Sequence, residues 1–500
     1  MYDDNHLITR LRAASLGHET RNFATFPARA SMTFGELFAG AERNAAALAG
    51  MGVQPGDRVA VQVDKSIEAI QLYLGTVMAG GVFLPLNTAY TTPEVAYFLG
   101  DATPRVVVCD PAREDEIAEV AGAARVVTLD AKGLGTLTDA VVGRGGFTPV
   151  PRGPDDLAAI LYTSGTTGRS KGAMLSHANL ASNSETLRDY WRFTDSDVLI
   201  HALPIFHTHG LFVATNVALL AGARVVFLKG FDADAILKAM PQATALMGVP
   251  TFYTRLLADP RLTKDRAANM RLFISGSAPL LVETHEQWEA RTGHRILERY
   301  GMTETNMSTS NPYDGERRAG TVGFPLPGVE ARVMHEGKEV PAGEIGVLEV
   351  RGTNVFQGYW QMPEKTAEEL RPDGWFITGD MAMIDADGYV TIVGREKDLV
   401  ITGGFNVYPK EVESLIDDLP GVLESAVIGV PHPDFGEGVV AVVVPEGEGT
   451  TPEAITAALE GKLARFKQPK RIFMIEALPR NTMGKVQKKA LRDAYAGLFS

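Results

Sequence analysis

The chain has 500 residues, more than one compact core usually holds, so two or more domains are expected. Its composition, with 45% hydrophobic and 22% charged residues, is ordinary for a globular protein. The formal net charge of −13 argues against a general nucleic-acid surface, because phosphate binding needs a basic field, so local cationic groups must meet any anionic substrate.

The N-terminal stretch "MYDDNHLITRLRAASLGHET" has no apolar core for secretion, and its two aspartates argue against an organelle transit peptide. No stretch of the chain reaches the roughly 18–20 uninterrupted apolar residues that a membrane span needs. We therefore expect a cytoplasmic enzyme that has neither a membrane nor nucleic acid among its partners.

Short apolar runs alternate with helix-like stretches over most of the chain. Residues 34–50 predict a helix that Thr33 and Glu36 could open as a capping box. Strands are predicted at "DRVAVQVD" (57–64), "RVVVCD" (105–110), "ARVVFL" (223–228) and "MRLFISG" (270–276). Such runs, separated by helices, are typical of buried parallel strands in an α/β sheet. The only cysteine, Cys109, lies in one of them, which favours a buried structural thiol and excludes a disulfide framework within the chain.

The pattern changes after about residue 394. The stretch "GRGGFTPVPRGP" (143–154) reads as a loop between two subdomains, whereas the tail combines the apolar runs "ESAVIGVP", "EGVVAVVVP" and "KRIFMIEALP" with helical segments near 409–418 and 452–465. The join "GREKDLVITGG" is charged and then glycine-rich, which suits a hinge. We predict a large N-terminal domain of layered α/β subdomains over 1–394 and a small mobile α+β domain over 395–500.

The strongest chemical signal is "ILYTSGTTGRSKG" (160–172). Its glycines let the backbone approach a ligand closely, and its hydroxyl groups, Arg169 and Lys171 suit phosphate oxygens. The spacing differs from a P-loop, because Ser170 precedes the lysine and Gly172 follows it. On composition alone, a flexible surface loop remains the alternative.

Further motifs follow in order: "YGMTE" (300–304), "TGD" (378–380), "GREKD" (394–398), "GGFNVYP" (403–409) and "PRNTMGKVQK" (479–488). Together with the first motif they closely resemble the adenylate-forming acyl-CoA synthetases, relatives of luciferases and peptide-synthetase adenylation domains. The resemblance implies ATP, Mg2+ and CoA as reactants. In that family an acid and ATP give an acyl-adenylate and pyrophosphate, the small C-terminal domain rotates, and the CoA thiol displaces AMP.

The resemblance also implies a role for each motif. The β- and γ-phosphates of ATP would be held by Thr163, Ser164, Gly165, Thr166, Thr167, Gly168 and Lys171. The remaining nucleotide site would include Gly276, Ser277, Ala278 and Pro279 at the adenine, followed by Tyr300, Gly301 and Met302. Thr303 would touch the α-phosphate and Glu304 would hold Mg2+, whose usual ligands are carboxylate and phosphate oxygens. Asp380 would accept from the ribose hydroxyls, with Arg395 assisting.

Lys485 matches the catalytic lysine of the family. It would bridge the substrate carboxylate and the α-phosphate and stabilise the negative charge that develops there. The alternative is a solvated lysine in a basic tail, since Lys488 and Lys489 follow closely. Lys397 falls at the hinge position of the family, and "GGFNVYP" would line the tunnel for the thiol.

Two arginines fall on the expected acyl pocket. The resemblance places the pocket at "FHTHG" (206–210), "PTFYTRLL" (250–257), "SGSAP" (275–279) and "YGMT", which brings in Arg255 and Arg299, with His207 and Ser277 as further donors. An arginine buried without an anion is strongly unfavourable. Two arginines at one pocket therefore indicate a second carboxylate on the substrate, held by a bidentate fork.

The expected substrate is thus a small dicarboxylic acid, and Met302 with its apolar neighbours favours a short one. The segments around these positions resemble malonyl-CoA synthetases in particular, some of which also accept methylmalonate. We predict that Arg299 is the main clamp for the second carboxylate and that Arg255, Ser277 and His207 support it. A salt bridge on its own helix is the alternative for Arg255, and a structural ion pair is the alternative for Arg299. His207 could instead gate the pocket or pack on the adenylate, and the role of His209 is more ambiguous still.

Other functions stay open at this point. A synthetase for another small carboxylic acid would not need the two arginines. An adenylation domain would load a carrier protein rather than CoA. A regulatory nucleotide-binding protein without turnover would have no use for Thr303, Glu304, Asp380 and Lys485 together. The sequence does not choose between a monomer and a dimer.

Overall fold

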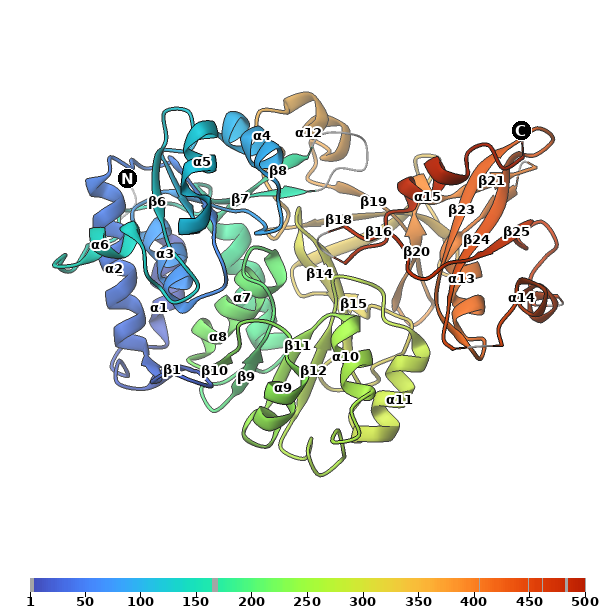
Figure 1. The fold of residues 1–500 in the computed structure, drawn as a ribbon, viewed down its shortest axis with the longest axis horizontal. Coiled ribbons are helices and arrows are strands. Elements are labelled where there is room, and N and C mark those ends of the chain that lie inside the picture. Colours follow the sequence, from blue (N-terminus) through green and yellow to red (C-terminus); the bar gives the residue numbers. More distant parts are fainter. Residues whose placement is uncertain are drawn as a thin grey trace. The chain divides into compact units, whose positions relative to one another are not determined.

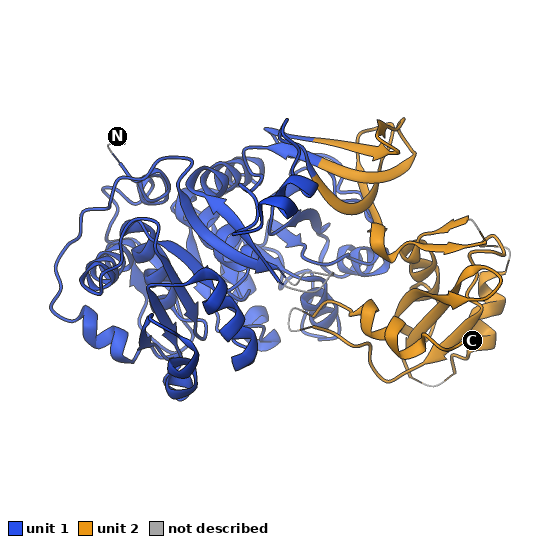
Figure 2. Ribbon diagram, turned by 90° about the horizontal axis from the view of Figure 1, so that it is seen from above, with its two compact units in different colours: residues 1–330, 350–376 blue, residues 331–349, 377–500 orange. Residues whose placement is uncertain are grey.

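The computed structural model describes residues 4–163, 170–403, 405–447, 449–460, 462–481 and 484–499. The chain forms two compact units (Figure 2). Unit 1 contains residues 1–330 and 350–376, and unit 2 contains 331–349 and 377–500. The predicted domain boundary near residue 394 concerns a movement between two reaction states and stays a prediction.

One sheet of unit 1 has the strand order β6-β5-β3-β4-β7-β8, in which β7 and β8 pair antiparallel and the others parallel. Figure 1 labels β6, β7 and β8 of this sheet. Its strands are β3 (Arg58–Gln62), β4 (Val82–Pro85), β5 (Val106–Cys109), β6 (Arg125–Thr128), β7 (Leu157–Thr163) and β8 (Lys171–Ser176). The helices that alternate with these strands are α2 (Phe34–Gly50), α3 (Ile67–Met78), α4 (Thr92–Ala102), η1 (Pro111–Arg113), α5 (Glu114–Val120) and α6 (Thr136–Val141).

A second sheet has the order β15-β14-β13-β12-β11-β9-β10-β1-β2. Its strands are β1 (Asn22–Thr25), β2 (Met32–Thr33), β9 (Val198–His201), β10 (Arg224–Phe227), β11 (Ala245–Gly248), β12 (Leu272–Ser275), β13 (Leu297–Met302), β14 (Asn306–Ser310) and β15 (Phe324–Pro325). The helices of this part of unit 1 are α1 (His6–Ala13), α7 (His177–Tyr190), the π-helix η2 (His209–Thr215), α8 (Asn216–Ala221), α9 (Ala233–Ala239), η3 (Met240–Gln242), α10 (Pro250–Leu257) and α11 (Val282–Thr292). Helix α12 (Pro363–Glu369) contacts the first sheet instead, through Glu369 and Lys171 of β8.

The local sequence signals explain these elements. Thr33 caps α2 and exchanges hydrogen bonds with Glu36, as the predicted capping box requires. The predicted apolar runs form strands β3, β5, β10 and β12, and Cys109 is fully buried. Because β9 to β13 run parallel, their carboxyl ends meet at one edge of the sheet, where ligands of α/β proteins bind.

The tail of unit 2 packs around its own sheet, with the order β22-β21-β24-β23 and β25 beside β24. Its elements are η4 (Glu396–Asp398), β21 (Val400–Thr402), β22 (Phe405–Val407), α13 (Pro409–Asp417), β23 (Val422–His432), β24 (Gly436–Pro445), α14 (Pro452–Leu459), β25 (Arg471–Met474) and α15 (Lys488–Tyr495). Alternate residues of β23 and β24 belong to two separate apolar clusters, so both faces of these strands are buried. This confirms the expected small α+β fold. Helix α14 ends at Leu459, earlier than the sequence indicated.

A further sheet has the order β17-β16-β18-β19-β20, formed by β16 (Val329–His335), β17 (Lys338–Glu339), β18 (Ile345–Gly352), β19 (Phe376–Ile384) and β20 (Val390–Arg395). It carries the predicted ribose-binding residues. Within the described ranges, no helix combines the length and apolar character that a membrane span requires.

Candidate active site

Arg299 lies in β13, in the interior of unit 1. Its side chain is buried, with 3% of the residue exposed. Neither Nε nor Nη2 has a hydrogen-bond partner among the described residues. Burial lowers the pKa of Arg299 to about 9, and nearby Tyr253 and Glu298 raise it only in part. The guanidinium is therefore a buried cation without an ion-pair partner in the described part of the chain.

The residues after β12 shape the space next to this guanidinium. A Cβ atom on Gly276 would lie 2.4 Å from Cζ of Arg299, so only glycine lets the guanidinium approach the backbone here. Ser277 adopts a left-handed conformation with φ of 71°, which a non-glycine residue rarely takes. The two positions bring the end of β12 and the arginine of β13 together, as the sequence predicted.

A histidine that the sequence left ambiguous joins this group. His209 begins the π-helix, and its Nδ1 lies 3.3 Å from the hydroxyl of Ser277. Burial, helped by Arg299 and His207, lowers the pKa of His209 well below its usual value, so the ring is neutral. Its Nε2 has no hydrogen-bond partner in the described ranges. His207 lies nearby and accepts from the backbone N–H of His209 at 3.5 Å.

Arg255 differs from Arg299 in its exposure. It is on the exposed side of α10, and its guanidinium is 5.5 Å from the ring centroid of Phe231. No hydrogen bond or ion pair within the described ranges joins it to Arg299 or to a residue of its own helix. Arg255 is thus exposed whereas Arg299 is buried, and the supporting role of Arg255 stays a prediction.

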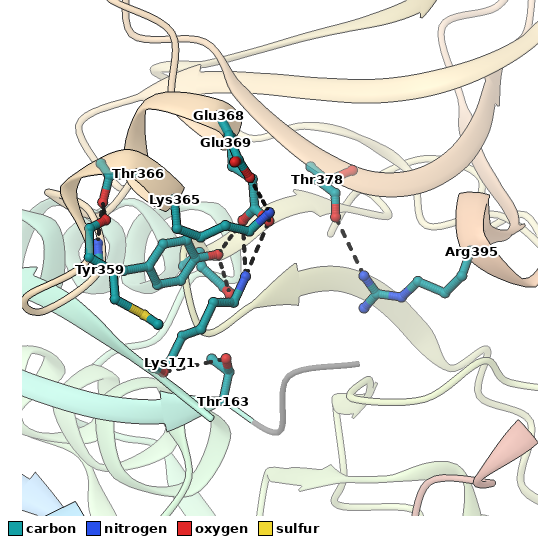
Figure 3. Close-up of polar contacts among 11 residues, drawn as sticks. Thr163, Lys171, Tyr359, Lys365, Thr366, Glu368, Glu369, Thr378 and Arg395 are labelled. Atoms are coloured by element: carbon teal, nitrogen blue, oxygen red, sulfur yellow. Dashed lines mark hydrogen bonds and ion pairs between the residues drawn. The ribbon is translucent and has the colours of Figure 1, made fainter. Parts of the chain in front are cut away.

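The two ends of the motif at 160–172 lie in the paired strands β7 and β8, which form a hairpin. Thr163 ends β7 and Lys171 begins β8, and the two residues pair across the strands. The Thr163 hydroxyl donates to the carbonyl of Lys171 at 3.4 Å, and Nζ of Lys171 forms an ion pair with Glu369 at 3.2 Å (Figure 3). The connecting residues Ser164, Gly165, Thr166, Thr167 and Gly168 lie outside the described residues.

Thr303 and Glu304 lie in the turn between β13 and β14. Glu304 is buried, with 5% exposed, and accepts from the hydroxyl of Tyr359 at 3.0 Å. Gly301 is required before this turn, because a Cβ atom there would lie 1.8 Å from the carbonyl oxygen of Asn306. Met302 and Thr303 are half-buried, and Tyr300 donates to the sulfur of Met302 at 3.5 Å. Ala278 and Pro279, expected at the adenine, are exposed.

Glu304 is suited to a magnesium site in which phosphate oxygens supply further ligands. The described residues contain no group of three or more histidine, cysteine or acidic side chains that could hold a metal ion. A single carboxylate with phosphate oxygens and water is a common magnesium environment in enzymes that use nucleotides. The residues present are therefore compatible with Mg2+ bound through Glu304 and a triphosphate.

In unit 2, Asp380 and Arg395 pair across β19 and β20. Asp380 is 3% exposed and its Oδ1 lies 2.7 Å from Nε of Arg395. Arg395 also donates to the carbonyl of Thr378 at 3.4 Å (Figure 3). Lys397 lies in η4, where burial lowers its pKa to about 8. The ion pair orients a buried carboxylate that can accept hydrogen bonds from a sugar.

Lys485 is exposed in unit 2, and its backbone N–H donates to the side chain of Asn481 at 3.0 Å. The neighbouring lysines have other partners. Lys488 pairs with Glu413 at 2.5 Å, and Lys489 pairs with Asp493 at 2.8 Å. Lys488 and Lys489 are thus held by ion pairs within unit 2, so they do not form a solvated basic tail together with Lys485.

Comparison with known proteins identifies the class. The family model "AMP-binding enzyme" matches residues 12–360, and the model "AMP-binding enzyme C-terminal domain" matches residues 411–485. The chain belongs to the family of AMP-binding enzymes, and the predicted adenylate-forming fold is confirmed.

Among solved structures, the ATP-bound crystal structure of MatB from Rhodopseudomonas palustris is 60% identical to this chain. It has a TM-score of 0.97 over 99% of this chain and 100% of that chain. A malonate–CoA ligase of Arabidopsis thaliana is 35% identical over 482 residues, which are 89% of this chain and 81% of the relative. A sulfoacetate–CoA ligase of Cupriavidus necator is 37% identical over 474 residues, which are 92% of each chain.

Proposed function

We propose that this protein joins malonate to CoA in an AMP-forming reaction that passes through an acyl-adenylate. The observation that carries the choice of acid is Arg299, a buried guanidinium with two unpartnered nitrogen atoms among the described residues. A carboxylate at the far end of the acid would satisfy both nitrogens with parallel hydrogen bonds. The relative named for malonate supports the same substrate.

The neighbours of Arg299 add specificity. Ser277 and the neutral His209 offer polar groups close to the guanidinium, and Gly276 leaves room for a planar group beside it. An acid without the second anionic group would leave the guanidinium buried and unpaired, which typically costs a factor on the order of 10⁴ in kcat/KM. Methylmalonate adds only a methyl group, so it stays a candidate substrate.

The first half-reaction joins the acid to the α-phosphate. ATP supplies the adenylyl group, and Lys171 and Thr303 would bind its phosphates. Glu304 would hold Mg2+, which neutralises phosphate charge when it is bound. Asp380, oriented by Arg395, would accept from the ribose hydroxyls. Lys485 would stabilise the charge that develops between the acid and the α-phosphate.

The second half-reaction uses CoA as the thiol. The turn around Lys397 would act as the hinge of the moving C-terminal domain, and the residues from Gly403 to Pro409 would line the thiol path. A cytoplasmic location and the absence of nucleic acid and membrane partners remain predictions from the sequence.

Release of AMP with ATP, Mg2+ and CoA tests the proposal. The acids to compare are malonate, methylmalonate, succinate, sulfoacetate, acetate and butyrate, and mass spectrometry of the thioester identifies the product. Malonate should give the highest kcat/KM. A preference for sulfoacetate would support Arg299 as the clamp for a second anionic group but would replace malonate as the substrate. A preference for butyrate or acetate would show that the substrate has no second anionic group.

A further inference from the structure

A carboxylate with no role in the reaction described so far lies beside Lys171. Glu369, the last residue of α12, accepts from Nζ of Lys171 at 3.2 Å on each of its two oxygens. The hydroxyl of Tyr359 donates to the same carboxylate at 2.6 Å, and Nζ of Lys365 lies 2.9 Å from it. Figure 3 shows these side chains converging on Glu369.

Lys171 is held from two directions. Its ammonium lies against Glu369, and it also lies 4.1 Å from the ring centroid of Tyr359, which is a cation–π contact. An ammonium has three N–H donors, so one donor remains for a ligand while two point at Glu369. A lysine that is already held loses less conformational freedom when it binds a phosphate.

Tyr359 itself has a fixed place relative to Lys171. The backbone N–H of Trp360 donates to the carbonyl of Gly172 at 2.7 Å, which attaches this segment to β8. The backbone N–H of Tyr359 donates to the hydroxyl of Thr366 at 2.9 Å, which attaches it to α12. Tyr359 therefore connects the strand that begins with Lys171 to the helix that ends with Glu369.

The Tyr359 hydroxyl lies between two carboxylates. It is 2.6 Å from Glu369 and 3.0 Å from Glu304. A phenol carries one proton, so it can donate fully to only one of them at a time. The hydroxyl thus couples the carboxylate that would hold Mg2+ to the carboxylate that holds Lys171.

Glu369 stays ionised in this arrangement, and the ammonium groups of Lys171 and Lys365 balance its negative charge. Burial alone would raise its pKa, but Tyr359, Lys365 and Lys171 lower the pKa of Glu369 below its usual value. Lys365 remains as a cationic partner if Lys171 shifts toward a phosphate. Because Lys365 would still neutralise Glu369, a triphosphate could bind Lys171 without leaving the carboxylate unpaired.

We propose that Glu369 and Tyr359 are positioning residues for the triphosphate end of the site. Glu369 holds Lys171 ready for a phosphate oxygen, and the Tyr359 hydroxyl couples this ion pair to Glu304. The inference rests on the proposed function, because it takes Lys171 and Glu304 as ligands of magnesium-bound ATP.

Calorimetric binding of a non-hydrolysable ATP analogue with Mg2+, in the absence of acid and CoA, tests the inference separately from turnover. AMP serves as a second ligand, because it lacks the β- and γ-phosphates. The variants are Glu369→Gln, which keeps the shape and removes the charge, and Tyr359→Phe, which keeps the ring and removes the hydroxyl. Glu368→Gln is the matched control, since Glu368 lies next to Glu369 on α12 and bonds Lys365 at 2.7 Å.

We expect Glu369→Gln to weaken binding of the analogue about 3- to 15-fold and to change AMP binding less than about twofold. Tyr359→Phe should raise the Mg2+ concentration that gives half-maximal binding, and Glu368→Gln should match wild type. Unchanged or tighter analogue binding by Glu369→Gln would overturn the inference, as would an equal loss for AMP. If wild type itself failed to bind the analogue, the proposed function would fall instead. If Glu369→Gln does not fold, Glu369→Asp, which keeps the charge but withdraws it from Lys171, and Tyr359→Phe replace it, and analogue binding equal to that of wild type in both would overturn the inference.

Discussion

Arg299 is better explained by binding than by folding. A buried cation without an anion destabilises a folded chain, so a fold selected for stability alone would avoid it. The cost makes sense if the substrate supplies the missing anion. Perturbed ionisable groups of this kind concentrate at functional sites.

Replacing Arg299 with methionine should separate these two explanations. We expect Arg299→Met to keep or raise the melting temperature in the absence of substrate, because it removes the unpaired buried charge. Malonate should raise the melting temperature of wild type and leave that of the variant unchanged. A loss of several degrees in the variant without ligand would show that Arg299 holds the fold together.

The pKa of Arg299 predicts a dependence of malonate binding on pH. Its value of about 9 means that the free enzyme carries the charge below pH 9 and loses it above. The bound anion favours the charged form, so the KM for malonate should be constant up to about pH 8 and rise about tenfold by pH 10. The rate at saturating malonate, measured at each pH, controls for denaturation. A KM for malonate that stays flat to pH 10 contradicts a guanidinium clamp with this pKa.

The sequence proposed Arg299 and Arg255 as ligands of the same carboxylate, but only Arg299 is buried in the structure. The buried residues of α10 are Phe252, Tyr253 and Leu256, which lie on one face of the helix. Arg255 falls outside this face, so helical periodicity alone could have predicted its exposure. His209 was ambiguous because the sequence does not show that the π-helix directs it toward Ser277.

The strands and turns near the site were easier to predict than their exact ends. Apolar runs and the Thr33 capping box gave correct elements because each depends on neighbouring residues. The contact of α12 with the β7–β8 hairpin depends on residues nearly 200 positions apart, such as Lys171 and Glu369. No local pattern encodes such a contact, so the sequence did not reveal a role for Glu369.

Asp417, at the end of α13, predicts a local effect on stability. Burial raises its pKa to about 6, although Lys410 and Ser425 act in the opposite direction. Since the pKa is about 3.8 in the unfolded chain, the folded state binds more protons between these values, and stability falls as pH rises through them.

Asp417→Asn should therefore stabilise unit 2 at pH 8, by roughly 1–2 kcal/mol, and should have little effect below pH 4. Asparagine can still accept from the Ser425 hydroxyl, which lies 2.6 Å from Asp417. Hydrogen exchange of the amides in α13 and β23 at the two pH values measures the difference. Equal protection of wild type and variant at pH 8 argues against the raised pKa.

The two units divide the predicted chemistry along the chain. Unit 1 holds Arg299, Lys171 and Glu304, whereas unit 2 holds Asp380 and Lys485. The order of the motifs was enough to predict the fold of the family, but the sequence placed Asp380 in the N-terminal domain (1–394), whereas the structure has it in unit 2. The boundary between the N-terminal domain and the rotating C-terminal domain is defined by two conformations of the chain. The sequence motifs therefore place this boundary only near the hinge at Lys397.

Lys485→Ala tests the division of labour. We expect adenylate formation from malonate and ATP to fall by a factor on the order of 10² or more, because the lysine stabilises charge only in that step. Thioester formation from chemically prepared malonyl-adenylate and CoA should remain within a fewfold of wild type. Lys489→Ala is the matched control, since Lys489 pairs with Asp493 on the surface of unit 2. Equal loss in both half-reactions would show that Lys485 serves the whole cycle.

The most direct measurement of the central claim is the ratio of kcat/KM for malonate to that for butyrate, in wild type and in Arg299→Met. A guanidinium clamp predicts a ratio on the order of 10⁴ in wild type that falls toward unity in the variant, mainly through loss of malonate activity. A ratio that is near unity in wild type, or that the substitution leaves unchanged, would contradict a guanidinium clamp for a second carboxylate.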